Sequence, residues 1–130
     1  MSWFEDIDDA GFLRSLFPKA PRGRDGFHVH EVVVSREGPT VRIRLDLPDY
    51  PVSPPRKWVE AGYDTVSLTL MAIGVHSLSL EGIDVDMCCS LVIAKSESGI
   101  TLELKGRTNY ICVETEFLRV DEVRGYCNAG

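Results

Sequence analysis

The sequence has few cysteines, and their spacing excludes two common ways of stabilising a small fold. There are four in 130 residues: Cys88 and Cys89 are adjacent, whereas Cys112 and Cys127 lie far apart. Adjacent cysteines cannot bridge each other without strain, and there is no C-x-x-C pair. We therefore predict neither a disulfide framework nor a structural zinc site.

Long hydrophobic runs are also missing. No apolar stretch approaches the roughly 20 residues that cross a bilayer as a helix. The first residues, Met1–Asp6, are acidic and lack the basic and apolar regions of a secretory signal. We therefore expect no membrane partner and a cytoplasmic location, and the lack of a disulfide framework agrees with this.

Positive charge is scarce. The chain has 14 Lys and Arg against 20 Asp and Glu, which gives a formal net charge of −6 and a pI near 5.0. Binding to a phosphate backbone depends on Lys and Arg, so we expect no nucleic-acid partner. An acidic surface keeps a protein in solution, and it also suits a basic protein partner, because opposite potentials steer encounter.

What the sequence does contain is a run of short apolar and polar alternations from Phe27 almost to the end. The clearest covers 40–47. A period of two places alternate side chains on opposite faces of a strand, so one face is buried and the other is in water. The residues predicted to face the core are Val41, Ile43, Leu45 and Leu47, and those predicted to face solvent are Thr40, Arg42, Arg44 and Asp46.

Similar alternations and turn signals divide the rest of the chain. They place Val66, Leu68, Leu70 and Ala72 on one strand face, and Ile100, Leu102 and Leu104 on the inward face of another strand. We predict strands at 27–36, 40–47, 64–73, 76–81, 88–95 and 100–105, and two more within 110–126 that break near 117–119. Such spacing predicts a mostly β fold, an antiparallel β-sandwich or partly open barrel of about seven to eight strands. At this length we expect a single domain, residues 1–130, with its sheet in 27–126.

The segment 1–17 is predicted to be helical. Ser2-Trp3-Phe4-Glu5 has the spacing of a capping box, and Asp9 could cap a second short helix. Phe12, Leu13, Leu16 and Phe17 would form an apolar stripe on that helix. We expect this segment to close one end of the sheet domain or to cover one face of it.

The segment 48–62 is a proline-rich excursion from the sheet. Four of the eight residues 48–55 are prolines, which cannot take part in a strand ladder. Trp58 follows them. It either fastens this segment to the sheet or serves as a hot spot for a partner, since both uses are typical of tryptophan.

No arrangement in the sequence predicts catalysis or a bound cofactor. His28 and His30 share a strand face, and a zinc site would need His76 beside them, so we predict no metal site. The cysteines within strands are read as small core residues. The pairs Asp84/Asp86 and Glu114/Glu116 are read as exposed. The chain is therefore predicted not to be an enzyme.

Several stretches nevertheless resemble the immunity protein 50 family of bacterial polymorphic toxin systems. They are Trp3, Val29-His30-Glu31-Val32, Arg36-Glu37-Gly38-Pro39, Leu45-Asp46-Leu47-Pro48-Asp49-Tyr50-Pro51, Pro54-Pro55-Arg56-Lys57-Trp58 and Asp64-Thr65-Val66. The resemblance extends to about Gly82 and weakens beyond it. It implies a small cytoplasmic protein that binds and neutralises a toxin domain, without catalysis.

Function in such a fold concentrates on ordered loops, so the candidate partner-binding residues lie in the excursion. They are Asp49, Tyr50, Arg56, Lys57 and Trp58. The main alternative is a β-barrel that binds a small ligand in its interior. An enzyme using His28, His30 and a carboxylate ranks third. Self-association through unpaired strand edges is compatible with each of these.

Overall fold

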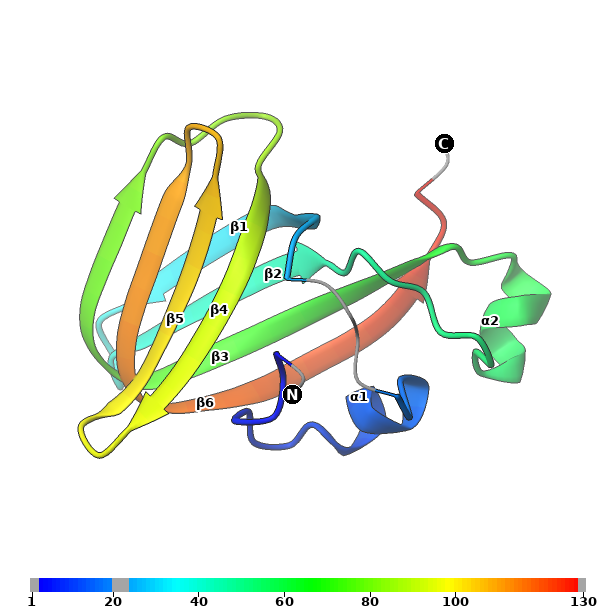
Figure 1. Cartoon of the computed structure of the whole chain (residues 1–130), viewed down its shortest axis with the longest axis horizontal. Helices are drawn as coiled ribbons and strands as arrows, with labels where there is room; N and C mark the ends of the chain where they lie inside the picture. The colour runs from blue at the N-terminus through cyan, green and yellow to red at the C-terminus, as the bar shows by residue number, and fades with distance from the viewer. Residues whose placement is uncertain (1–2, 20–23, 129–130) are drawn as a thin grey trace.

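The computed structural model describes residues 3–19 and 24–128, which form one antiparallel sheet closed into a barrel (Figure 1). The strands follow one another around the barrel in the order β1-β2-β3-β6-β5-β4. In chain order the elements are α1 (Gly11–Leu16), β1 (Phe27–Ser35), β2 (Thr40–Asp46), α2 (Arg56–Ala61), β3 (Thr65–Glu81), β4 (Cys88–Ser96), β5 (Gly99–Gly106) and β6 (Tyr110–Tyr126). The mostly β, antiparallel prediction is confirmed.

The described part of the chain has six strands, fewer than the seven or eight expected. The stretches 64–73 and 76–81 belong to one strand, β3, and 110–126 is one strand, β6, without a break near 117–119. Both strands bend while they stay paired. The register shifts between Thr69 and Leu70 and again between Val75 and Ser77, and such bulges turn a strand without ending it.

Because β3 and β6 bend, each of them contributes to both walls of the barrel. In Figure 1 they run along the lower edge and turn upward on the left, where β5 and β4 pair beside β6. Gly74 lies at the bend with a φ of +74°, a conformation that side chains with a Cβ rarely adopt. A glycine is therefore needed where the strand turns.

The barrel closes between β1 and β4 through a short contact. The paired residues are Phe27 with Cys89 and His28 with Cys88, whereas β1 and β2 pair along most of their length. The Val29 amide also donates to the Met87 carbonyl at 2.9 Å. Beyond this corner, β1 continues beside β2 alone.

The core occupies the barrel interior and follows the alternation in the sequence. Val41, Ile43, Leu45 and Leu47 are at most 7% exposed. The corresponding inward positions of β3 and β5 are also buried: Val66, Leu68, Leu70, Ala72, Ile100, Leu102 and Leu104. The predicted inward faces of these strands are confirmed.

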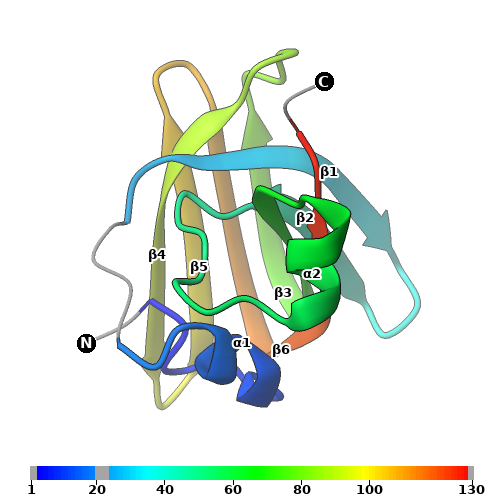
Figure 2. The same cartoon turned by 90° about the vertical axis from the view of Figure 1, so that its right-hand side faces the viewer.

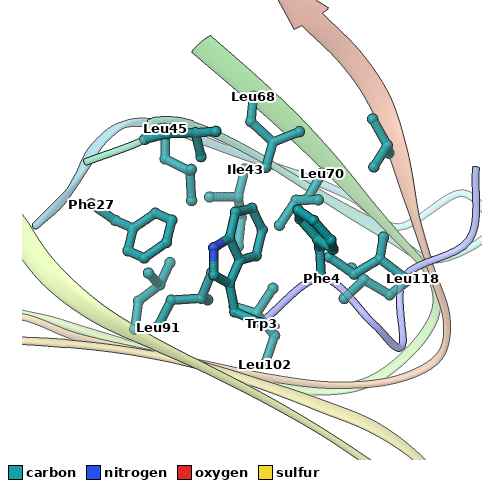
Figure 3. Close-up of a cluster of buried hydrophobic side chains, with 14 of the residues drawn as sticks. Trp3, Phe4, Phe27, Ile43, Leu45, Leu68, Leu70, Leu91, Leu102 and Leu118 are labelled. Atoms are coloured by element: carbon teal, nitrogen blue, oxygen red, sulfur yellow. The ribbon is translucent and has the colours of Figure 1, made fainter. Parts of the chain in front are cut away.

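The N-terminal segment inserts large side chains into the barrel. Trp3 stands among residues from several strands, and its ring lies 5.1 Å from those of Phe4 and Phe27, both edge-on (Figure 3). Phe4 and Ile7 are buried as well. The interior is therefore filled by the chain's own side chains.

The predicted helix over 1–17 was too long. Residues 3–6 form a turn, and α1 covers Gly11–Leu16 with Ala10, not Asp9, at its N-cap. Asp8 instead forms a bridge to Arg119 of β6, which holds this part of the chain in extended pairing. Ser2 of the expected capping box lies outside the described residues. Of the apolar stripe, Leu13 and Leu16 are buried, whereas Phe12 is 48% exposed.

Among the described residues, neither helix has the length and apolar character needed to cross a membrane.

Candidate functional site

The excursion covers one end of the barrel. Figure 2 looks onto that end and shows the segment after β2, then α2, with α1 below them. As expected, residues 48–55 make no strand, but α2 is a helix where none was predicted. Pro55 stands at the N-cap of this helix, where a missing N–H costs little, and Gly62 ends it with a φ of 71°.

Trp58 fastens the excursion to the barrel. It is 9% exposed, and its ring lies 6.3 Å from that of Tyr50, 6.5 Å from that of Tyr63 and 6.1 Å from that of Phe12. Gly125 of β6 passes so close that a Cβ there would lie 2.7 Å from Trp58 Cδ2. The position of Trp58 therefore fits a role in packing the excursion against the barrel.

The five candidate partner-binding residues fall into three settings. Trp58 is buried, and Arg56 and Lys57 are exposed on α2, where Arg56 Nε lies 3.2 Å from Glu60 Oε1. Asp49 and Tyr50 are half-buried and line a cavity beside β2. Their part in partner binding stays a prediction.

That cavity has a volume of about 330 Å³ and is lined mainly by polar and charged residues. We call it the acidic cavity, because the charged side chains that line it are Asp46, Asp49 and Asp64, with His28 at the same wall. The described lining contains no Lys or Arg. A neighbouring cavity of about 460 Å³ differs, since Arg44 and Arg124 line it together with Glu122.

The predicted solvent exposure of Asp46 is wrong. The alternation assigned it to the solvent face, but it is 3% exposed. The Tyr126 hydroxyl donates to its Oδ2, and His30 Nε2 lies 2.7 Å from the same oxygen. Burial, followed by the hydrogen bond to Asp46, raises the pKa of Tyr126 to about 12, so its hydroxyl keeps its proton near neutral pH.

No local signal would have revealed this burial. Tyr126 comes from the end of β6, 80 positions from Asp46 in the sequence. His30 reaches Asp46 because the β1–β2 register shifts between Val29 and Glu31. Both causes depend on strand pairing and not on the neighbours of Asp46 along the chain.

Three oxygen atoms around the acidic cavity lack hydrogen-bond partners. They are Oδ1 of Asp46, Oδ2 of Asp49 and the hydroxyl oxygen of Tyr50, each buried within the described protein. A buried polar atom without a partner is costly, by roughly 1–3 kcal/mol.

The three histidines lie in separate surroundings. His28 Nδ1 is 3.6 Å from Asp86 Oδ1, His30 contacts Asp46, and His76 Nε2 is 3.9 Å from Glu116 Oε1. Within residues 3–19 and 24–128 no three His, Cys, Asp or Glu side chains converge as metal ligands do. Within the described residues, His76 is therefore not brought together with His28 and His30 as metal ligands.

None of the four cysteines, all within the described residues, forms a disulfide, and only one is fully buried. Cys89 lies in the core, where burial and then the adjacent Cys88 raise the pKa of its thiol above the usual value. Cys88 and Cys127 are exposed and Cys112 is intermediate. The reading of strand cysteines as core residues is right for Cys89 and wrong for Cys88, whose side chain faces away from the barrel.

Comparison with known protein families decides the lineage. The model of the family described as immunity protein 50 matches residues 11–126. The chain belongs to this family. The matched stretch of this immunity protein runs from the first residue of α1 to the last of β6 and leaves out the buried Trp3 and Phe4. No curated protein and no solved structure shows significant similarity to it.

Proposed function

We propose that this protein binds the toxin domain of a bacterial polymorphic toxin system and neutralises it in the cytoplasm of the cell that makes it. The observation that carries the proposal is membership of the immunity protein 50 family over residues 11–126. Proteins of an immunity family protect against a toxin, so a protein partner follows from the family in general.

A binding role without catalysis agrees with the surface. The net charge of −6 favours encounter with a basic partner, because complementary potentials steer association. The histidines and carboxylates are engaged in separate pairs along the barrel wall. We therefore propose that this protein neutralises the toxin by binding to and covering part of the toxin's surface.

The alternative, a barrel that holds a small ligand, is less well supported. Trp3, Phe4 and Phe27 fill the space between the walls (Figure 3). The cavities described above lie at the surface of the barrel, and their lining includes exposed and charged residues.

The deciding experiment uses the gene next to the one that encodes this chain. The C-terminal domain of that gene's product is expressed in a naive bacterium with and without this protein, and any complex is purified. Relief of growth arrest together with a stable complex is the expected result. Growth arrest that this protein does not relieve would contradict the proposal.

A further inference from the structure

We propose that the free edge of β1, residues 31–35, receives an extended basic segment of the toxin, which joins the sheet as a further strand. This assignment rests on the proposed function and names the surface that meets the toxin. β1 pairs with β4 only at Phe27 and His28, after which the Val29 amide donates to the Met87 carbonyl at 2.9 Å. From residue 31 onward, β1 pairs only with β2 within the described part of the chain.

The free edge presents backbone groups that no neighbouring strand uses. A strand in an antiparallel pair bonds to one neighbour through alternate residues, so the other residues of 31–35 point their N–H and C=O groups away from β2. Among the described residues, no other segment hydrogen-bonds to these groups. Figure 2 shows the reason: β1 runs across this end of the barrel and β4 runs down its side, so the two strands diverge from their corner. Another extended chain is the partner that satisfies such a row.

The side chains of the edge also favour strand addition. Val33 is 43% exposed and Val34 is 59% exposed. Consecutive residues of a strand lie on opposite faces, so both faces of β1 are accessible here. Proteins protect exposed edges with lysine or proline, and the run Val32-Val33-Val34 contains neither. An apolar, β-branched run on an unpaired edge is a template for pairing with another chain.

A groove of about 450 Å³ lies beside the start of this edge. It is bounded by β1 around Val32, by Leu80 near the end of β3, and by Ile83 and Val85 of the β3–β4 loop. Ile83 is 76% exposed, and Leu80 and Val85 are exposed as well. Side chains on one face of an added strand would cover these apolar residues, which contributes binding energy beyond the backbone hydrogen bonds.

The charges around the groove favour a basic toxin segment over a second copy of this chain. Glu31 and Asp84 line the groove together with His30, and its described lining contains no Lys or Arg. A second copy would bring another Glu31 and Asp84 to the same place, and two chains of net charge −6 repel each other. A toxin segment that combines apolar side chains with Lys or Arg suits both the apolar wall and the carboxylates.

Hydrogen exchange distinguishes strand addition from other kinds of contact. Amide exchange of the ¹⁵N-labelled full chain is measured alone and in complex with the toxin domain encoded by the neighbouring gene. The amides of 31–35 that point away from β2 should exchange fast in the free chain and at least about tenfold more slowly in the complex, because each gains a hydrogen bond. The amides of 92–96 in β4 serve as the internal reference and should not change. Slow exchange of the outward β1 amides in the free chain, or no slowing in the complex, overturns the inference.

Two substitutions of equally exposed valines test the position of the interface. Val34→Lys places a charge on the free edge, and Val59→Lys places the same charge on α2, where Val59 is 63% exposed. Neither side chain is buried, so both variants should fold, which their urea midpoints verify. We expect Val34→Lys to raise the Kd for the toxin domain at least about tenfold and Val59→Lys to change it less than about twofold. A larger effect of Val59→Lys would place the toxin on the excursion and contradict the inference.

A second pair tests the charge of the toxin segment. The double variant Glu31→Gln, Asp84→Asn removes both carboxylates of the groove, and asparagine retains the Oδ1 that accepts from the Val85 amide. Glu97→Gln removes one exposed charge from the turn between β4 and β5. We expect the double variant to raise the Kd at least about threefold and to weaken its dependence on salt, with no change for Glu97→Gln. An unchanged Kd for the double variant would refute a basic occupant.

These outcomes separate the inference from the proposed function. Toxin binding that leaves the β1 amides unprotected and is unaffected by Val34→Lys overturns the inference while the proposed function stands. If the wild-type chain binds no toxin, the proposed function fails, and with it the toxin as the occupant of the edge. Sedimentation of the chain alone completes the test: a dimer that Val34→Lys dissociates would assign the edge to a second copy and overturn the inference.

Discussion

Replacing Trp58 by alanine tests whether the excursion is held by packing. The side chain is 9% exposed. A tryptophan buries about 150–250 Å², which at about 25 cal/mol per Å² corresponds to about 4–6 kcal/mol. Measured Trp-to-Ala changes in cores cost about 3–5 kcal/mol. We expect the free energy of unfolding to fall by about 3–5 kcal/mol, because the excursion lies at the rim of the barrel and can partly collapse around the missing side chain.

The assay is urea unfolding followed by far-UV circular dichroism, since the substitution removes one of two tryptophans and alters fluorescence. Val59→Ala is the matched control: it is the next residue of α2 and is 63% exposed. Its stability should stay within about 0.5 kcal/mol of wild type. A loss below about 1 kcal/mol for Trp58→Ala would refute the packing argument. Trp58→Phe keeps an aromatic ring for packing. Comparing its stability with its affinity for the toxin then separates a packing role from a contact with the toxin.

Three further predictions follow from the same structure. Gly125→Ala places a Cβ 2.7 Å from the Trp58 ring and should cost about 1–3 kcal/mol in urea unfolding, whereas an unchanged midpoint would contradict that close approach. Trp3→Ala empties the centre of the barrel and should cost about 3–5 kcal/mol, measured in the same way. Ultraviolet titration should show Tyr126 ionising near pH 12, and Tyr126→Phe should remove that step. Because this pKa is raised on folding, the stability from the Tyr126–Asp46 contact is complete below pH 10 and is lost as the pH rises through about 12.

The candidate site was only partly foreseeable. Proline content placed Asp49 and Tyr50 in an excursion from the sheet, where the structure has them. That Asp46 lines the same cavity was not predicted. By alternation Asp46 falls on the solvent face of β2, but a residue of β6 buries it. The sequence left two roles open for Trp58, packing of the excursion and contact with a partner. Its contacts with Tyr63 and Gly125, which favour packing, appear only in the structure.

The fold divides in the same way. The sequence by itself determined which residues of β2, β3 and β5 face inward, because a strand alternates its side chains whatever it pairs with. It did not determine where β3 and β6 bend or that they continue through the bend. Those features, like the closure at Phe27 and Cys89 and the cavity beside Asp46, come from pairing between distant segments. Tertiary structure decided them because the energy of such a contact depends on both partners, and only one of them is present in any local stretch of sequence.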